Sequence, residues 1–487
     1  MEIDIRWHLI LSMAGILVHG DEDAAWLASK ALVASGNPND DYFEIKRSGK
    51  KLVISVKGRA ASLDKHICEP LIGLMLTGTL PKDQVLKVLP IHETREPEEC
   101  LLEGIKESYC GLDTGYATIF ASGSNLIGLR DPLGQRPLFY AMAQSHIVLS
   151  SCKKVIWALH DEPEAHPSGI ISLFSNLSFR RVKVRTLEPN PHHSRDSLGE
   201  ASDRLITLLN SSLENCTKKT NRVGVLFSGG LDSAVVACVA KMLGLKTRLY
   251  SAAFLDEKRL THAVKVSEKL NLELHTRLVS EEDLDQAIRH TVWAAETADI
   301  LQVSVALPLD VAIRAALEEG EQVLLTGSGA DELFGGYARY LDVIRSLGPC
   351  GLSRAMSSDL KRLSERDALR DGALGESNRI QLYAPFLNLN VVEYALALPV
   401  GFKVKNPMDA LRKHILREAA IKLNVPVEAT YSPKKAAQFS SGSLKAVNKL
   451  AYSKGLQAQE YVSEVLTKVR KELVENARRV SRNVSDN

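Results

Sequence analysis

Residues 223–233 read Val-Gly-Val-Leu-Phe-Ser-Gly-Gly-Leu-Asp-Ser, and they decide the fold of the larger part of this 487-residue chain. The first five residues have the length and the β-branched and aromatic content of a buried parallel strand. The apolar segment 234–240 follows the turn and has the composition of a helix. A strand, a glycine turn and a helix place backbone N–H groups and a helix N-terminus around an anion. The stretch therefore predicts a phosphate-binding turn in an α/β sheet.

The residue types of the turn at 228–233 suit a nucleotide site. The two glycines allow close approach and positive φ, and the two serines add hydroxyl donors. Asp232 should repel an anion, unless it holds a divalent cation that bridges to phosphates. An ordinary turn with a serine N-cap is the alternative, but six residues in this order after a strand favour a phosphate site. The predicted nucleotide-binding residues here are Ser228, Gly229, Gly230, Leu231, Asp232 and Ser233.

A second block begins at residue 323, where Val-Leu-Leu precedes Thr-Gly-Ser-Gly-Ala-Asp-Glu-Leu-Phe-Gly-Gly-Tyr at 326–337. Together the two blocks resemble the ATP pyrophosphatase domain of the asparagine synthetase family, which adenylates substrates and releases pyrophosphate. The carboxyl edge of a parallel sheet is where open α/β folds bind ligands. The resemblance implies ATP and Mg²⁺ as cofactors, with Asp232 and Asp331 for Mg²⁺, Thr326 and Gly327 for the adenylate, and Ser251 near the adenine.

Three later segments extend the resemblance, at residues 384–388, 412–417 and 433–439. The last reads Pro-Lys-Lys-Ala-Ala-Gln-Phe and is similar to the family's late lysine segment. The resemblance assigns Lys435 a catalytic role over the pyrophosphate, where a point cation stabilises developing charge. Lys434 is the alternative, and two adjacent lysines are otherwise typical of a solvated surface.

The N-terminal half resembles a glutaminase domain that has lost its nucleophile. Residues 13–16, Met-Ala-Gly-Ile, are similar to the start of the family's N-terminal-nucleophile domain, in which a cysteine uses its own α-amino group as a base. Ala14 stands in the cysteine position, behind residues 1–12. Segments 111–117 and 130–140 match the scaffold, and we interpret 130–140 as a β-hairpin. We therefore expect the scaffold without glutamine hydrolysis.

The synthetase half departs from the family where the amide forms. Ser328 stands where relatives carry a glutamate that is assigned to the incoming ammonia. Gln381, Tyr383 and Asn388 also replace charged residues, so carboxylates that could act as bases are lost. The pattern resembles a divergent branch, the asparagine synthetase domain-containing proteins of eukaryotes and their archaeal relatives.

The composition is that of an ordinary globular protein, with 45% hydrophobic residues. The 61 basic and 59 acidic residues give a net charge of +2, so electrostatics provide no case for nucleic-acid binding. Seven scattered cysteines without metal-ligand spacing favour reduced thiols and a cytoplasmic location. We expect small-molecule partners, no transmembrane span and no membrane partner. The oligomeric state stays open.

Strands that alternate with helices after residue 200 predict a doubly wound parallel α/β sheet. By resemblance, the preceding half is an α+β domain, an αββα glutaminase-like sandwich. The expected boundaries are 13–190 for the glutamine amidotransferase-like domain, 200–455 for the ATP-pyrophosphatase domain with C-terminal helices, and 456–487 for a helical tail.

Two functions fit the sequence. The first is an ATP-dependent amide ligase that adenylates a carboxylate, aspartate by analogy, with ammonia rather than glutamine as the nitrogen source. The second is an ATP-binding pseudo-enzyme or scaffold that has lost amide formation. The changes at Ala14, Ser328 and Gln381 favour the second. The residues Asp232 and Asp331, with Lys435, favour the first, which we prefer.

Overall fold

The computed structural model describes residues 12–18, 41–47, 52–58, 66–68, 71–77, 97–122, 125–175, 178–185, 187, 196–218, 220–433 and 437–485. Its contacts divide the chain into two units. Unit 1 comprises Met1–Thr186, Ala368–Arg379 and Glu464–Asn487, and unit 2 comprises Leu187–Asp367 and Ile380–Ser463. Two segments of the C-terminal half, 368–379 and 464–487, therefore belong to unit 1. The predicted boundaries treated each domain as one continuous stretch of sequence and did not include this.

Unit 2 is built on a parallel sheet. Its strands are β13 (Arg222–Leu226), β14 (Lys246–Phe254), β15 (Leu274–Val279), β16 (Val323–Leu325) and β17 (Gln381–Tyr383). Among the described residues the strand order is β15-β14-β13-β16-β17, and all neighbouring pairs are parallel. Successive strands run outward in opposite directions from β13 and β16, so the topological switch point lies between these two strands. The predicted parallel α/β sheet is confirmed.

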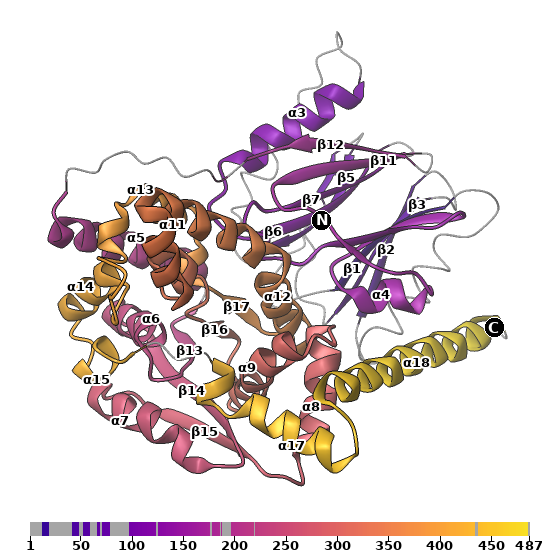
Figure 1. Cartoon of the computed structure of the whole chain (residues 1–487). Helices are drawn as coiled ribbons and strands as arrows, with labels where there is room; N and C mark the ends of the chain where they lie inside the picture. The colour runs from indigo at the N-terminus through magenta and orange to yellow at the C-terminus, as the bar shows by residue number, and fades with distance from the viewer. Residues whose placement is uncertain are drawn as a thin grey trace. The chain divides into compact units, whose positions relative to one another are not determined.

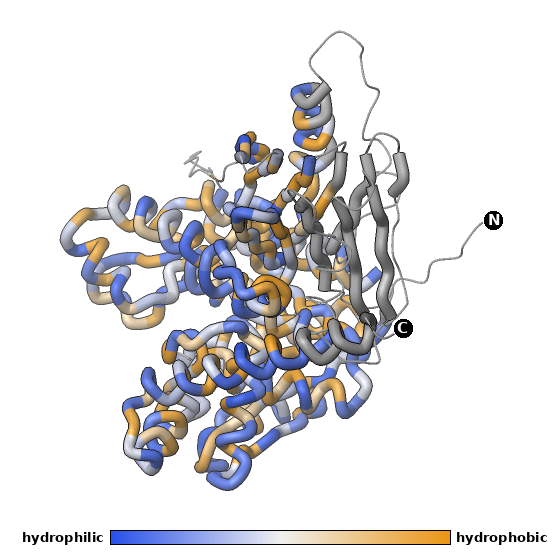
Figure 2. The backbone as a smooth tube through the Cα atoms, turned by 90° about the vertical axis from the view of Figure 1, so that its right-hand side faces the viewer, coloured by the Kyte–Doolittle hydropathy of each residue, from blue (hydrophilic) through white to orange (hydrophobic). Residues whose placement is uncertain are grey.

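Helices cover both faces of this sheet. Those used below are α5 (Leu198–Thr217), α6 (Leu231–Met242), α8 (Leu284–Ala295), α9 (Ile300–Glu318), α14 (His414–Lys422) and α17 (Ser443–Ser453). Helix α6 packs against β13 and β14, with α5 and α14 behind it. Helix α9 packs against β13, β14 and β15 on the other side, with α8 and α17 against it (Figure 1). Figure 2 shows that hydrophilic and hydrophobic residues alternate along the helical turns of the chain, as in amphipathic helices.

The remaining helices of unit 2 are short, apart from two long ones. They are η1 (Glu257–Leu260), α7 (Thr261–Leu270), α10 (Ala330–Phe334), α11 (Arg339–Glu365), η2 (Pro385–Leu387), α13 (Leu389–Ala397), η3 (Val400–Phe402), α15 (Val427–Thr430), α16 (Ala437–Ser440) and α18 (Ala458–Ser485). Helix α18 is shared between the two units, because unit 2 ends at Ser463.

Helix α9 bears on the expectation that the chain has no transmembrane span. Within the described residues it is long and apolar enough, by length and composition alone, to cross a membrane. The apolar window is 61% buried inside the structure. Its buried Asp310 accepts a hydrogen bond from Thr291 Oγ1 (2.9 Å) and lies 2.8 Å from His290 Nδ1. A buried and paired carboxylate on a largely covered helix is typical of a core helix.

Unit 1 contains two antiparallel sheets. Their strands are β1 (Ser12–Val18), β2 (Asp41–Arg47), β3 (Leu52–Gly58), β4 (His66–Cys68), β5 (Leu71–Thr77), β6 (Tyr116–Ser122), β7 (Asn125–Arg130), β8 (Phe139–Met142), β9 (His146–Ser150), β10 (Glu164–Ala165), β11 (Ile170–Ser175) and β12 (Ser178–Lys183). Over the described residues the orders are β10-β8-β9-β1-β3-β2 and β12-β11-β7-β6-β5-β4. The sheets face each other, since β6 contacts both β1 and β3. The helices are α3 (Pro97–Cys110), α4 (Lys153–Ala158) and α12 (Asp367–Asn378), with the C-terminal part of α18.

Residues 130–140 do not form the hairpin that we predicted. Strand β7 ends at Arg130 and pairs with β6 and β11, whereas β8 begins at Phe139 and pairs with β9 and β10 of the other sheet. The buried Arg130 guanidinium donates three hydrogen bonds of 2.6 to 3.1 Å to backbone carbonyl oxygens. A buried guanidinium needs such partners, and they fix a corner that carries the chain between the sheets.

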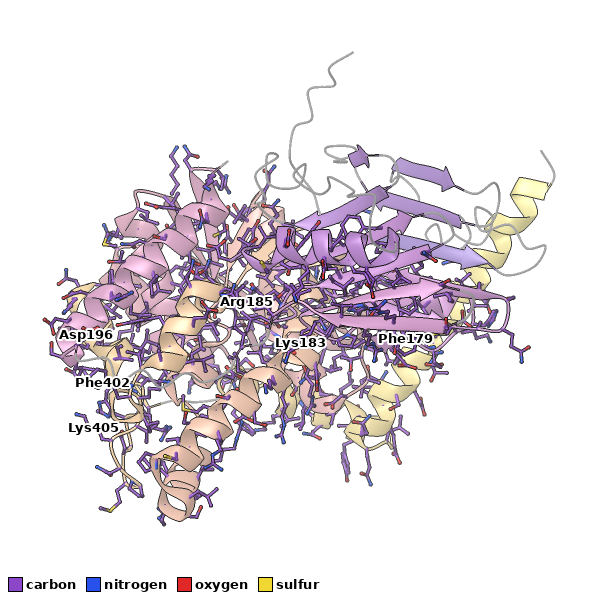
Figure 3. The ribbon with its side chains drawn as sticks, turned by 90° about the horizontal axis from the view of Figure 1, so that it is seen from above. Phe179, Lys183, Arg185, Asp196, Phe402 and Lys405 are labelled. Carbon is purple, nitrogen blue, oxygen red and sulfur yellow. The ribbon has the colours of Figure 1, made fainter. Side chains whose placement is uncertain are left out.

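Strand β12 is an edge among the described strands of its sheet. Most of its side chains are exposed, and three of them are basic: Arg180, Arg181 and Lys183. Figure 3 labels Phe179 and Lys183 on this strand and Arg185 beyond its end. Basic side chains on an edge strand discourage pairing with another chain.

Candidate functional site

The structure brings Asp232 and Asp331 together at the carboxyl edge of the unit 2 sheet. Strands β13 and β16 are parallel neighbours. Asp232 lies in the first turn of α6, which follows β13, and Asp331 lies in the first turn of α10, which follows β16. A helix N-terminus stabilises a negative side chain. The two side chains are 16% and 15% exposed, so they are largely shielded from water but still accessible.

A lysine side chain lies between these two carboxylates. Nζ of Lys413 is 2.6 Å from Oδ1 of Asp232 and 2.6 Å from Oδ1 of Asp331. The two carboxylate oxygens are therefore within twice that distance of each other. The Lys413 side chain is only 3% exposed. One buried ammonium thus bridges the carboxylates that the sequence analysis assigned to a metal.

Two glycines allow backbone to approach this pair closely. A Cβ on Gly336 would lie 1.9 Å from Oδ1 of Asp331 and 2.3 Å from Cε of Lys413. A Cβ on Gly327 would lie 2.9 Å from Cβ of Asp232. Neither position accepts a side chain without displacing the carboxylates or the lysine. Gly327 therefore acts through close packing against the start of α6.

The turn between β13 and α6 is held by its own hydrogen bonds. Ser233 Oγ accepts from the Ser228 amide (3.3 Å) and donates to the Gly230 carbonyl oxygen (3.2 Å). Ser228 Oγ accepts from the Gly230 amide (3.3 Å). Gly229 has φ of 74°, and a Cβ there would lie 2.9 Å from Cα of Ala263. Ser233 is buried and shapes the turn, whereas Ser228 is exposed and available to a ligand.

A pocket of about 460 Å³ opens beside this turn. Of the predicted nucleotide-binding residues, those that line it are Ser228, Gly230, Leu231 and Asp232. Those that lie outside its lining are Gly229, Ser233, Ser251, Thr326 and Gly327. Both Ser251, within β14, and Thr326, directly after β16, are buried. Lys434 and Lys435 lie outside the described residues, so the catalytic assignment stays a prediction.

Five basic residues line the pocket, and the sequence analysis gave none of them a role: Lys258, Arg259, His262, Lys413 and Arg417. The first three come from η1 and α7, and nothing in their local sequence marks them as binding residues. The last two lie at the start of α14, where Lys413 is the left-handed N-cap residue and Arg417 follows in the first turn. The resemblance of segment 412–417 to the family was an available signal. So many basic groups favour a polyanionic ligand.

A strained turn positions Lys413. Arg412 and Lys413 both have φ of 52°, and a left-handed non-glycine residue costs about 1–3 kcal/mol. Asp409 Oδ1 accepts hydrogen bonds from the amides of Leu411 and Arg412. Although burial opposes it, hydrogen bonds from backbone amides and an imidazole hold the pKa of Asp409 below its ordinary value. Arg412 Nε donates to the Gly336 carbonyl oxygen at 3.1 Å, which connects this turn to the carboxylate pair.

A second carboxyl group, that of Glu332, is buried next to Asp331. Burial, and then the charge of Asp331, raise the pKa of Glu332 to about 7. The Tyr337 hydroxyl donates to Glu332 Oε1 at 2.5 Å. Burial and the nearby carboxylates also raise the pKa of Tyr337, so its hydroxyl keeps the proton. The sequence analysis did not single out Glu332.

The neutral residues that the sequence analysis placed where the amide would form make local contacts. Ser328 Oγ lies 3.1 Å from Thr326 Oγ1. Tyr383 Oη donates to Gln381 Oε1 at 3.4 Å, within β17. Asn388 Oδ1 accepts a backbone hydrogen bond at the start of α13, where it is the N-cap. These contacts have the character of fold-stabilising interactions.

The Asp232–Asp331 pair fits a divalent cation that also binds phosphate. In the part of the chain that the structure describes, no three or more His, Cys, Asp or Glu side chains are grouped as a metal site. Mg²⁺ is usually bound by one or two carboxylates together with phosphates and water. The Lys413 ammonium stands in for a cation between the carboxylates. The donor set is therefore sufficient for Mg²⁺ with a nucleotide.

Ala14 lies inside a sheet. It belongs to β1, and its backbone is opposite Ser55 of β3 on one side and Ser150 of β9 on the other. The strand begins at Ser12, so Ala14 is preceded by residues that pair with β3. A terminal nucleophile would instead have a free α-amino group.

Comparison with known proteins matches the chain to one enzyme family. The sequence profile of the asparagine synthase family matches residues 204–349 and 346–482. A Methanocaldococcus jannaschii protein assigned as glutamine-hydrolysing asparagine synthetase 1 is 28% identical over 417 residues, which cover 74% of this chain and 75% of that protein. The human glutamine-hydrolysing asparagine synthetase is 26% identical over 390 residues, covering 72% and 68%. Its Cricetulus griseus counterpart is 27% identical over 386 residues, covering 70% and 65%.

Two solved structures share low similarity with the chain. The B. subtilis glutamine phosphoribosylpyrophosphate amidotransferase is 14% identical with a TM-score of 0.28, covering 51% of this chain and 67% of that one. The NMN synthetase of Francisella tularensis is 14% identical with a TM-score of 0.29, covering 58% and 96%. Neither likeness carries an argument here.

Proposed function

We propose that this chain, which belongs to the asparagine synthase family, activates a carboxylate, aspartate by analogy, as an acyl-adenylate and converts it to an amide. At the family level the relatives are ATP-dependent amide ligases. The observation that carries the proposal is the pairing of Asp232 with Asp331 beside a pocket that the phosphate turn and basic residues line. Such a pocket suits a nucleotide whose phosphates are bound through a divalent cation.

In the proposed reaction, a carboxylate oxygen of the substrate attacks the α-phosphorus of ATP, and pyrophosphate leaves. The nitrogen of ammonia then attacks the acyl carbon and loses a proton, and AMP leaves with the electrons of the acyl–oxygen bond. Ser228 and the amides at the start of α6 would bind phosphate oxygens. Lys258 and Lys413 would offset negative charge that grows on the leaving group. Mg²⁺ held by Asp232 and Asp331 would supply Lewis-acid charge neutralisation at the phosphates.

Ammonia rather than glutamine is the proposed nitrogen source. Ala14 carries no nucleophilic group and lies within β1 rather than at a free amine. The assignment of unit 1 as a glutaminase-like sandwich is part of this proposal, and its two facing antiparallel sheets support it. A reducing compartment such as the cytoplasm is also proposed, because among the described residues Cys110, Cys216, Cys238 and Cys350 form no disulfide.

The alternative is an ATP-binding pseudo-enzyme or scaffold. It is favoured by the local contacts of Ser328, Gln381 and Tyr383, which occupy positions that the resemblance assigns to charged groups. A protein of this kind would bind the nucleotide in the same pocket and would form no amide.

The test measures pyrophosphate release from ATP with Mg²⁺, with and without aspartate, and with ammonia or glutamine in parallel. Aspartate-dependent release with ammonia, and none above background with glutamine, supports the proposed ligase. ATP binding without turnover would favour the pseudo-enzyme. Turnover with glutamine would contradict the loss of the glutaminase at Ala14.

A further inference from the structure

Lys413 occupies the place between Asp232 and Asp331 that a divalent cation needs. We propose that Lys413 is a built-in counter-cation, which the metal must displace, so that the carboxylate pair binds metal weakly until the ammonium moves away. The inference rests on the proposed function in one respect, the assignment of the two carboxylates to a metal.

The contacts define a single cation position. Nζ of Lys413 lies 2.6 Å from one oxygen of each carboxylate, and its side chain is 3% exposed. A divalent cation held by the same two carboxylates would need the space that the ammonium fills. The ammonium and the metal would then overlap and repel each other, so only one of them is bound at a time.

Hydrogen bonds hold the backbone of Lys413 in place, while its side chain borders a pocket into which it can move. The backbone is held in the left-handed turn that Asp409 and the Arg412–Gly336 hydrogen bond support. The side chain itself lines the pocket of about 460 Å³. A lysine has a flexible four-carbon stem, so its ammonium can turn into the pocket while the turn stays in place.

The charge balance explains why a cation between the two carboxylates is favourable. Two carboxylates held this close together and largely shielded from water repel each other when no cation lies between them. The ammonium therefore stabilises the metal-free protein. Because the site is metal-competent only when the ammonium has left, the apparent metal affinity is reduced by the fraction of the time that the site is free.

A purely structural lysine makes a different prediction. If Lys413 only supports the fold, Lys413→Met lowers stability and weakens metal binding, because the carboxylates are no longer held in place. If Lys413 competes with the metal, the same variant binds metal more tightly. The sign of the change in affinity separates the two roles.

The experiment is a Mn²⁺ titration of the full chain without nucleotide, with free Mn²⁺ followed by electron paramagnetic resonance. The variants are Lys413→Met, Lys413→Gln, the double variant Lys413→Met/Asp331→Asn, and Lys449→Met, a matched control that breaks a surface ion pair with Glu281. We expect Mn²⁺ affinity to rise about tenfold or more in both single Lys413 variants. It should be lost in the double variant and unchanged in the control.

Melting curves in Mn²⁺ and in EDTA provide the second measurement. We expect both single Lys413 variants to melt below the wild type in EDTA and to recover in Mn²⁺ by a larger shift than the wild type shows. Equal or weaker Mn²⁺ binding by these variants would overturn the proposal. So would variants that stay unfolded in both solutions, because the metal would then be unable to replace the ammonium.

These readouts do not depend on turnover. A wild type without ATP–pyrophosphate exchange, but with the expected Mn²⁺ behaviour, would contradict the proposed function and leave this inference intact. Exchange in the wild type together with unchanged Mn²⁺ binding in the Lys413 variants would support the proposed function and contradict this inference.

Discussion

The edge between β13 and β16 differs from the segment around β17 in what its side chains do. At the first, Asp232, Asp331 and Lys413 are charged, contact one another and border a pocket. At the second, Gln381 and Asn388 are neutral, and they bond to a neighbouring side chain or cap a helix. The charges are retained where phosphate is expected to bind and are absent where the amide would form.

The β13–β16 edge costs more folding free energy than the segment around β17. A buried lysine between two carboxylates is weak evidence for stability, since apolar residues of similar volume often stabilise a fold equally well or better. The left-handed residues Arg412 and Lys413 add strain. Strain and buried charge cluster at functional sites, so the β13–β16 edge has the features of a functional site.

The largest effect should come from Asp331→Asn or Asp232→Asn. Each variant removes one charge from the pair that would hold the metal, and loss of one such group costs about 10²–10³-fold in rate. ATP–pyrophosphate exchange measures the adenylation step alone. Asp342→Asn is the control, because this exposed aspartate pairs with Arg345 on the surface. Exchange that survives in Asp331→Asn would refute the metal assignment.

Gly336→Ala should have the next largest effect. The new Cβ would lie 1.9 Å from Asp331 Oδ1, so the carboxylate and Lys413 must move. We expect a loss of up to about 3 kcal/mol in the free energy of unfolding, with a clear fall in exchange. Gly401→Ala is the matched control, since nothing lies within 4 Å of a Cβ there. If both variants behave alike in denaturant titrations and exchange, the packing at Gly336 is not critical.

Lys403 tests whether another buried charge near this edge reduces stability. It follows η3, and burial lowers its pKa to about 7. Between that value and the ordinary lysine pKa the unfolded chain binds more protons, so stability rises with pH above about 7. We expect a rise of about 2 kcal/mol between pH 7 and pH 9 that Lys403→Met abolishes. Urea titrations of both proteins across this range provide the measurement, and equal slopes would show that Lys403 is solvated.

The smallest effects should come from two neutral residues at positions that the resemblance links to amide formation, Ser328 in the turn after β16 and Tyr383 in β17. Ser328→Ala and Tyr383→Phe each remove a hydrogen bond between partly buried groups. We expect less than about 1 kcal/mol of lost stability and unchanged exchange. A fall in exchange comparable to that of Asp331→Asn would erase the contrast between the two regions, because it would give these neutral residues a part in adenylation.

Sequence patterns predicted the part of the site that depends on strand order. Asp232 and Asp331 follow two apolar strands, and the carboxyl ends of parallel neighbours meet at one edge. The position of Lys413 could not be predicted in this way, because it depends on two consecutive left-handed residues and on a hydrogen bond from Arg412 to the distant Gly336. Residues 130–140 were wrongly predicted for a similar reason: the bonds of the buried Arg130 send the chain to another sheet.

Helix α9 is a second case in which the local sequence does not determine the environment of an element. Its apolar composition is compatible with a membrane or a core. Two kinds of contact favour the core: Asp310 bonds to side chains of α8, and the helix packs against β13, β14 and β15. Local sequence specifies the strand, turn and helix of each motif. The partners of a buried charge are specified by the tertiary fold.

The most direct test of the account is ATP–pyrophosphate exchange by the wild-type chain with Mg²⁺, in the presence and absence of aspartate. Exchange requires adenylation but not amide formation, so it reports on the region that has kept its charges. The account predicts exchange that depends on both Mg²⁺ and the carboxylate substrate. Measurable ATP binding without exchange, for aspartate and for other small carboxylates, would contradict it.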